Sequence, residues 1–257
     1  MRSRLKEVFS FGEPVAGAPL IFLSVILIAL FQLPAQALVR AGHVSAGVAA
    51  NEILAIGGVP LIIIWLARLD RRRLIPLAVP SVRTLVLVAA LTLGADVAIE
   101  YLTFASELLI PASAKIDQAY EKLMAVSGAG DVVVKLFALC VFPAVFEEIY
   151  FRGFCLTSIA ARFSKPAAVA LSALLFAMLH GNAWYVHLYF LLGLLLGFVY
   201  LSTGSLWAAM LCHFINNAWT FSSHVAGFKL VGPSGPGASD AAILAAGLAL
   251  FTASALL

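Results

Sequence analysis

Residues 132–157, VVVKLFALCVFPAVFEEIYFRGFCLT, combine a long apolar run with four charged side chains. A helix rises about 1.5 Å per residue, so a run of this length can cross a hydrocarbon core about 30 Å thick. A charged side chain inside such a run costs roughly a few kcal/mol unless it is paired or reaches water. The segment therefore predicts a membrane helix that carries a polar site at Glu147, Glu148 and Arg152.

Seven further apolar runs occur along the 257-residue chain. Hydrophobic residues make up 63% of the sequence and charged residues 11%, with a mean hydropathy of +1.04, which excludes a soluble globular protein. We predict an all-α, polytopic transmembrane bundle of about eight helices, with seven as the alternative, enclosing an intramembrane polar cavity. We expect one integral membrane domain over 1–257, with its motif-bearing core at 132–223. The predicted spans are 18–39, 48–67, 84–106, 132–157, 166–181, 184–201, 206–223 and 240–257.

The distribution of charge predicts the orientation and excludes one class of partner. The 16 Lys and Arg residues form no face with interleaved aromatic residues, so we expect no nucleic acid partner, only the lipid bilayer and a substrate. Because cytoplasmic loops retain basic residues, we predict a multi-pass protein of the plasma (cell) membrane with both termini cytoplasmic. Ten basic residues then lie inside and four outside. The inside set is Arg2, Arg4, Lys6, Arg68, Arg71, Arg72, Arg73, Arg83, Arg162 and Lys165; the outside set is Arg40, Lys115, Lys122 and Lys229.

The two glutamates at the centre of the quoted segment have different surroundings. Glu148 and Arg152 are four residues apart, share a helix face, and are predicted to form an ion pair. Glu147 points about 100° away and has no charge partner in its own segment. A carboxylate removed from bulk water becomes a stronger base, which suits a general base acting on water. Pro143 removes the hydrogen bond to the carbonyl of residue 139 and is expected to kink the helix.

Two further polar motifs follow on later spans. His180 lies four residues after Phe176, and His213 lies four residues before Asn217 on one helix face. Both His213 and Asn217 can donate hydrogen bonds to an oxyanion, whereas Asn216, on another face, fits hydrogen bonding between helices. On straight helices Glu147 and His180 would differ by about 10 Å in depth, so tilt, a kink or later helix starts are needed to bring them together.

Glu-Glu-x-x-x-Arg, Phe-x-x-x-His and His-x-x-x-Asn, in that order on successive membrane helices, resemble the CPBP intramembrane proteases. This family contains the type II CAAX prenyl endopeptidases and the bacterial Abi-type proteins. The resemblance covers Glu147 to Asn217 and implies that Glu147 and His180 activate water. It also implies that His213 and Asn217 stabilise the oxyanion, with Glu148 and Arg152 in support.

The resemblance implies an intramembrane endopeptidase whose substrate is a membrane-anchored protein or peptide. Its best-known substrate class is a prenylated CAAX protein that loses its last three residues. Family members also occur where prenylation is not expected, with proposed roles in bacteriocin self-immunity or membrane-protein processing. The alternative from another class is a non-enzymatic scaffold, immunity protein or transporter that uses the same polar cavity.

A metal-dependent mechanism is the main rival to a metal-free one. Two histidines and a glutamate can in principle hold a catalytic zinc ion. However, HExxH is absent from the sequence and Asn is a poor zinc ligand. We therefore predict that no metal or other cofactor is needed, with zinc as the alternative.

Other polar residues are left without a clear role by the sequence. Asp96 and Glu100 share a helix face with no basic partner there; they are protonated, face the cavity, or pair with another helix, for instance with Lys135. Glu52, in the second span, is equally unexplained. Residues 115–124 predict an amphipathic helix, either packed against the bundle or acting as a lid.

Overall fold

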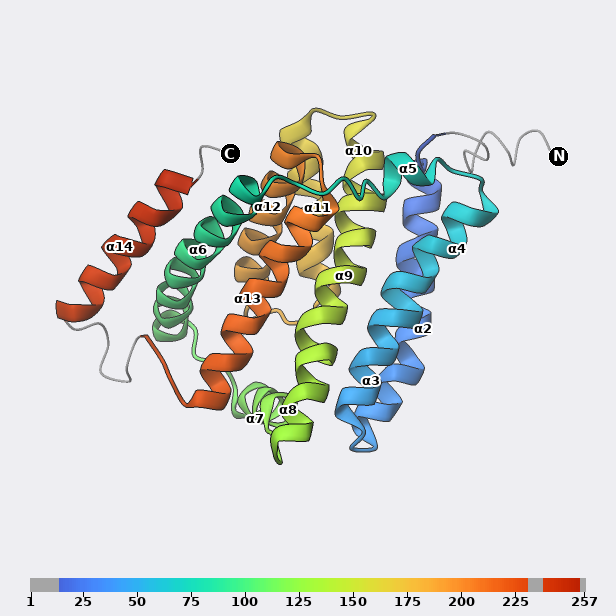
Figure 1. The fold of residues 1–257 in the computed structure, drawn as a ribbon. Coiled ribbons are helices and arrows are strands. Elements are labelled where there is room, and N and C mark those ends of the chain that lie inside the picture. Colours follow the sequence, from blue (N-terminus) through green and yellow to red (C-terminus); the bar gives the residue numbers. More distant parts are fainter. Residues whose placement is uncertain (1–13, 231–237, 255–257) are drawn as a thin grey trace.

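The computed structural model describes residues 14–230 and 238–254, and within these ranges it is all helical, with no strands (Figure 1). The predicted all-α fold is thereby confirmed. Arg2, Arg4 and Lys6 lie outside the described residues, as do part of the loop between the last two predicted spans and the last three residues of the final span. Five helices are long and apolar enough to cross a membrane, namely Ala18–Arg40, Val44–Leu66, Val82–Leu109, Ala129–Ala160 and Val186–Thr203. The protein is thus a multi-pass integral membrane protein.

All eight predicted spans are helical. Five of them correspond to the long apolar helices named above, and the other three do not. α11 (Lys165–Leu179) has only 15 residues, as its short predicted run indicated. α13 (Leu206–Ala226) has 21 residues and is rich in polar side chains toward its end. The last helix, α14 (Ala238–Ser254), packs along α6 (Val82–Leu109) at the edge of the bundle (Figure 1). The other long helices are α2 (Ala18–Arg40) and α12 (Val186–Thr203).

Two of the long helices contain π-helical segments. The second contains α3 (Val44–Ala50), the π-helical segment η1 (Asn51–Gly58) and α4 (Val59–Leu66). The fourth contains α8 (Ala129–Leu136), η2 (Phe137–Val141), α9 (Phe142–Glu148), η3 (Ile149–Leu156) and α10 (Thr157–Ala160), of which η2 and η3 are also π-helical. Wide turns of this kind are rare and occur frequently at functional sites.

Pro143 stands directly after the start of α9, and the wide turn η2 precedes it. Proline has no N–H, so the carbonyl of Leu139 loses its usual α-helical donor. In the structure Leu139 O instead accepts a hydrogen bond from Asn217 Nδ2 at 3.2 Å. The expected disturbance at Pro143 is therefore a wide turn that leaves a carbonyl free to bind the neighbouring helix.

The amphipathic segment forms α7 (Ala114–Met124) and packs against the bundle. Lys135 Nζ donates to the carbonyls of Leu123 and Ala125 at its end. Met124 packs in a buried cluster with Cys140 and Phe221. Of the two interpretations left open by the sequence, these contacts favour a packed helix, and Lys135 is engaged by α7 instead of pairing with Asp96 or Glu100.

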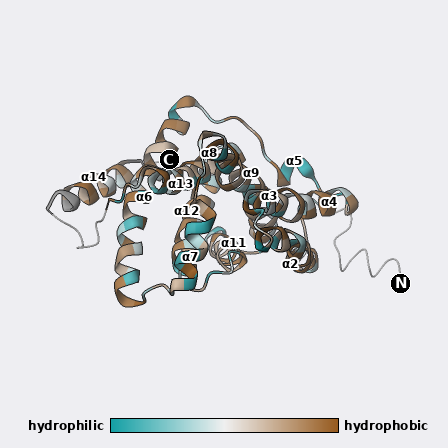
Figure 2. Ribbon diagram, turned by 90° about the horizontal axis from the view of Figure 1, so that it is seen from below, coloured by the Kyte–Doolittle hydropathy of each residue, from teal (hydrophilic) through white to brown (hydrophobic). Residues whose placement is uncertain are grey.

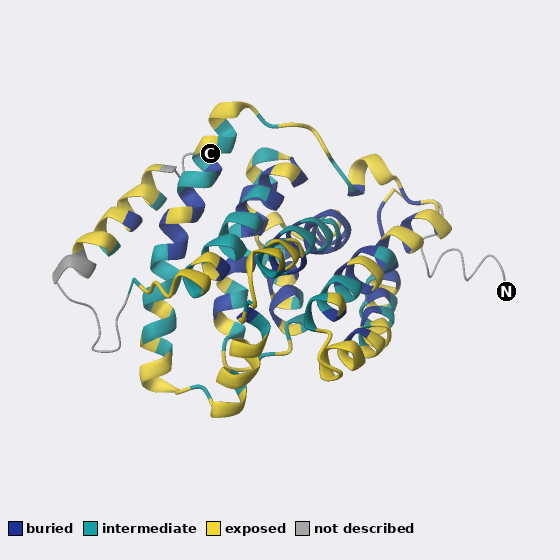
Figure 3. Cartoon of the chain, turned by 60° about the horizontal axis from the view of Figure 1, so that its bottom comes forward, coloured by how far each residue is buried: buried dark blue, intermediate teal, exposed yellow. Residues whose placement is uncertain are grey.

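The surface and the helix contacts fit a lipid environment. Large apolar side chains such as Phe22 and Trp65, 69% and 76% exposed, point outward, and apolar residues cover most helices in Figure 2. Buried residues gather where helices meet (Figure 3). A Cβ on Gly193 would come within 2.8 Å of Ala173 Cα, so the glycine allows α12 to approach α11 closely.

The two ends of the bundle differ in charge. The short helix α5 (Arg71–Leu74) contains three arginines and lies at the same end as the turn between α10 and α11, which carries Arg162 (Figure 1). α5 is also distinctly hydrophilic in Figure 2. α7 lies at the opposite end.

Candidate functional site

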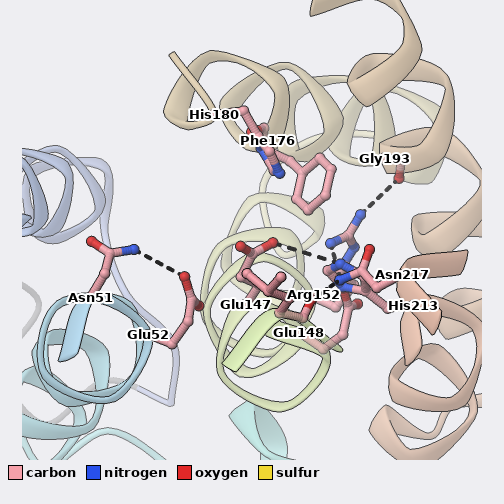
Figure 4. Close-up of polar contacts among 11 residues, drawn as sticks. Asn51, Glu52, Glu147, Glu148, Arg152, Phe176, His180, Gly193, His213 and Asn217 are labelled. Carbon is pink, nitrogen blue, oxygen red and sulfur yellow. Dashed lines mark hydrogen bonds and ion pairs between the residues drawn. The ribbon is translucent and has the colours of Figure 1, made fainter. Parts of the chain in front are cut away.

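Glu148, at the end of α9, is the centre of a buried ionic network. Its Oε1 accepts hydrogen bonds from Arg152 Nη1 at 2.8 Å and from His213 Nδ1 at 2.9 Å. Glu148 and Arg152 are completely buried and His213 is 1% exposed. The predicted Glu148–Arg152 pair is confirmed, and the structure adds His213 from α13 to it (Figure 4).

Arg152 links this network to two further helices. Its Nη2 donates to Gly193 O at 3.1 Å on α12. Its guanidinium lies 4.7 Å from the ring centroid of Phe176 on α11, a cation–π distance. Because a buried charge needs several partners to offset its lost hydration, Arg152 depends on the correct packing of all these helices.

Glu147 points to a different side of α9, as expected from its position next to Glu148. It is 9% exposed, and its Oε2 has no hydrogen-bond partner among the described residues. His213 Nε2 lies 3.9 Å from this oxygen. His213 therefore stands between the two glutamates, bonded to Glu148 through one ring nitrogen and facing Glu147 with the other.

His180 lies directly after the last residue of α11, Leu179. Its Nδ1 is 2.7 Å from Phe176 O, so Nδ1 carries the proton and Nε2 keeps a free lone pair. Its ring stacks on Tyr189 with the centroids 4.0 Å apart. The hydrogen bond and the stacked tyrosine together fix the tautomer and orientation of His180.

The expected difference in depth between Glu147 and His180 is resolved by the length of the fourth helix. Glu147 precedes Ala160, the end of this helix, by 13 residues, and α11 runs for 15 residues before His180. Both residues therefore lie about 20 Å from the shared turn between the two helices. The helices do not start later than expected; the fourth is 32 residues long and continues beyond the predicted span.

Glu147 and His180 line one cavity of about 580 Å³. Phe151, from η3, and Met178, from α11, contribute apolar surface to the same wall. The facing wall comes from α2 and the second helix and carries several polar side chains. They are Gln32, Gln36, Asn51 and Glu52.

His213 and Asn217 are positioned by the helices behind this cavity. They are four residues apart on α13, as predicted. His213 faces Glu147 and Glu148, whereas Asn217 Nδ2 is bonded to Leu139 O. Neither of these two side chains is part of the cavity wall that contains Glu147 and His180.

Glu52 is the residue at this cavity that the motifs did not identify. It is 4% exposed, accepts a hydrogen bond from Asn51 Nδ2 at 2.9 Å on Oε1, and has no partner for Oε2 among the described residues. Its acidic side chain in an apolar span was the available signal. A single sequence gives no indication that η1 packs against α9.

A second buried polar cluster lies apart from this cavity, between α6 and α13. Asp96 Oδ1 accepts a hydrogen bond from Asn216 Nδ2 at 2.6 Å, and Glu100 Oε1 accepts one from Leu230 N. The partner of Asp96 is thus a neutral amide from another helix. The expected role of Asn216 in helix-to-helix hydrogen bonding is confirmed.

In the described part of the chain, no group of three His, Cys, Asp or Glu side chains is arranged to hold a metal ion. The neighbouring side chains of Glu147, Glu148 and His213 do not form such a set. His213 Nδ1 is already used by Glu148, and Glu148 Oε1 also binds Arg152.

The architecture and the site define a multi-pass helical membrane protein with a buried Glu-Arg-His network beside a second glutamate in a cavity. Residues 129–219 match the family model described as Type II CAAX prenyl endopeptidase Rce1-like. Residues 129–219 thus form an Rce1-like (CPBP) domain that includes all seven motif residues, and the resemblance inferred from the motifs is confirmed. No curated protein and no solved structure matches the chain.

Proposed function

We propose that this protein is an intramembrane endopeptidase that hydrolyses an amide bond with water activated by Glu147 and His180. The observation that carries the proposal is the shared cavity. Glu147 and His180, from different helices, line it together, and Glu147 Oε2 has no hydrogen bond that would occupy it. Family membership over residues 129–219 supports the same class of activity.

In this mechanism Glu147 acts as the general base. Glu147 takes a proton from the attacking water, whose oxygen bonds to the carbonyl carbon of the scissile amide. His180 Nε2 accepts the second hydrogen of that water and orients it, since Nδ1 is held by Phe176 O. The C–N bond then breaks, and the nitrogen takes up a proton as the amine leaves.

His213 and Asn217 supply donors for the oxyanion. His213 is bonded through Nδ1 to Glu148, which orients the ring so that its Nε2 edge faces Glu147 and the substrate. Asn217 uses one amide hydrogen on Leu139 O and retains a second. Binding of the substrate in the cavity would place the carbonyl oxygen of its scissile amide between the cavity and α13.

The substrate we propose is a membrane-anchored protein or peptide, with the C-terminal tripeptide of prenylated CAAX proteins as the first class to test. We also propose the plasma membrane as the location, with both termini cytoplasmic. Two features support that orientation: the arginine-rich α5 and the Arg162 turn lie at one end of the bundle. The mechanism needs no metal, because the base and the oxyanion donors are protein side chains.

The test is cleavage of a farnesylated CAAX peptide by the purified protein in lipid, with wild type and Glu147→Gln compared in the presence and absence of a strong chelator. We expect the wild type to release the tripeptide with and without chelator, and Glu147→Gln to be inactive. Loss of wild-type activity on chelation would favour the zinc mechanism. Equal activity of Glu147→Gln would refute the role of Glu147. If no membrane peptide is cleaved, the scaffold or transporter alternative replaces the protease.

A further inference from the structure

The wall of the cavity that faces Glu147 carries a second buried acid, Glu52. It lies on η1, outside the segment 129–219 that matches the protease family. Glu52 and Glu147 line the same cavity, and each has an Oε2 atom without a hydrogen-bond partner among the described residues. Figure 4 shows the two carboxyl groups on η1 and α9, on either side of the space between these helices.

The fold brings η1 close to α9 at the position next to Glu147. A Cβ on Gly57 would lie only 2.4 Å from Cδ1 of Phe146, so only glycine allows this contact. This contact brings the segment that carries Glu52 against the helix that carries Glu147, and both acids line the same cavity.

Two buried carboxyl groups that line the same cavity do not both ionise readily, so such a pair readily keeps one proton. Glu148, by contrast, is hydrogen-bonded to Arg152 and His213. Asn51 donates an N–H to Glu52 Oε1, which leaves Oε2 as the atom of Glu52 that can carry a proton toward the cavity.

We propose that Glu52 is the acid partner of Glu147: from the opposite wall of the cavity it delivers a proton to the leaving amine. This inference rests on the proposed function. The reaction starts from the state in which the pair's one proton is on Glu52 and Glu147 is ionised. Glu147 takes a proton from water as the C–O bond forms, and the nitrogen takes the proton of Glu52 as the C–N bond breaks. Transfer of the proton from Glu147 to Glu52 restores the starting state.

Two substitutions separate a proton-carrying role from a structural one. Glu52→Gln keeps the length of the side chain and the acceptor for Asn51 but carries no acidic proton. Glu52→Asp keeps the acid but shortens the side chain. Asp96→Asn is the matched control, because Asp96 is 3% exposed, also has an unpartnered oxygen, and is not part of this cavity wall.

The experiment measures kcat and KM against pH for the three variants and the wild type in lipid vesicles, with Glu147→Gln as the inactive reference. We expect Glu52→Gln to lower kcat by about 100-fold with KM within about threefold, and Glu52→Asp to retain more activity than Glu52→Gln. Asp96→Asn should match the wild type.

The pH profile gives a readout that a structural role would not change. The wild-type kcat should fall at low pH, where Glu147 is protonated, and at high pH, where the pair loses its shared proton. The other titratable groups near Glu52 are His180 on the cavity wall, and Glu148, Arg152 and His213 behind Glu147. All of them remain in Glu52→Gln, so only the limb at high pH should disappear.

The outcomes distinguish the two proposals. If the wild type cleaves and Glu147→Gln does not, but Glu52→Gln keeps full activity, Glu52 is not the acid and the proposed function stands. Higher activity in Glu52→Gln than in Glu52→Asp, or failure of Glu52→Gln alone to fold, would assign Glu52 a structural role and overturn the inference. Absence of any cleavage by the wild type overturns the proposed function itself.

Discussion

In the described part of the chain, two groups of buried acidic side chains differ in what surrounds them. At the end of α9, Glu148 is bonded to Arg152 and His213, while the adjacent Glu147 lines a cavity of about 580 Å³. Between α6 and α13, Asp96 is bonded to the amide of Asn216. Both clusters place carboxyl groups inside membrane helices, yet only the first combines a network of charges with an acid that faces open space. We therefore expect burial beside a cavity to indicate catalysis more strongly than burial alone.

The largest expected effect is on the stability of the charged network. Arg152→Ala leaves Glu148 buried with the hydrogen bond to His213 but without its arginine, and Glu148→Ala leaves Arg152 without its carboxylate. Removal of one partner from a buried ion pair costs about 3–5 kcal/mol. We expect both variants to lose most of their folded yield and thermal stability, measured by size-exclusion chromatography and thermal unfolding in detergent. Normal yield of both would contradict the pairing.

A smaller effect, confined to activity, is expected at His180. His180→Ala removes the Nε2 atom that orients water and leaves the Glu148 network intact, so kcat should fall on the order of 100-fold while the yield is unchanged. Initial rates on a cleaved membrane peptide test this. A rate within threefold of the wild type would remove His180 from the mechanism.

Two glycines provide a matched pair of packing substitutions. Gly57→Ala forces the ring of Phe146, next to Glu147, to move, whereas Gly94→Ala meets the backbone of Gly247 and Phe251 on α14. Overpacking of this kind costs about 1–3 kcal/mol. We expect both variants to unfold at lower temperature but only Gly57→Ala to lose activity beyond its loss of folded protein. Equal specific activity in the two variants would show that η1 does not position the site.

The smallest effect is expected in the second cluster. Asp96→Asn keeps the oxygen that accepts from Asn216, so the hydrogen bond between α6 and α13 survives. The unfolding free energy should change by less than about 1 kcal/mol, as measured by denaturant titration in detergent. A drop of several kcal/mol would mean that the charge of Asp96 matters to the fold.

Much of this fold follows from the sequence because apolar runs and helical spacing act locally. The eight runs became helices close to their predicted bounds, and the Glu148–Arg152 pair follows from a spacing of four residues. The wide turns η1, η2 and η3 were not predictable, since they depend on contacts such as the bond from Asn217 to the carbonyl freed by Pro143.

The site could be predicted only where its residues share a motif. Glu147, His180 and His213 were identified from their motifs, but the bond between His213 and Glu148 joins α13 to α9 and has no signature in the spacing. Glu52 remained unassigned for the same reason: it lies 95 positions from Glu147 in the sequence, and the cavity that both line exists only in the folded bundle. Contacts between helices are set by packing, which a single sequence does not encode in any local pattern.

The most direct test of the difference between the two clusters compares Glu147→Gln with Asp96→Asn. The initial rate of peptide hydrolysis is measured for equal amounts of each folded variant in lipid vesicles, relative to the wild type. Both substitutions replace one buried acid by its amide. The account predicts that Glu147→Gln falls by about 1000-fold or more, whereas Asp96→Asn stays within threefold of the wild type. Similar rates in the two variants, whether both retained or both lost, would contradict the assignment of hydrolysis to the cavity at Glu147.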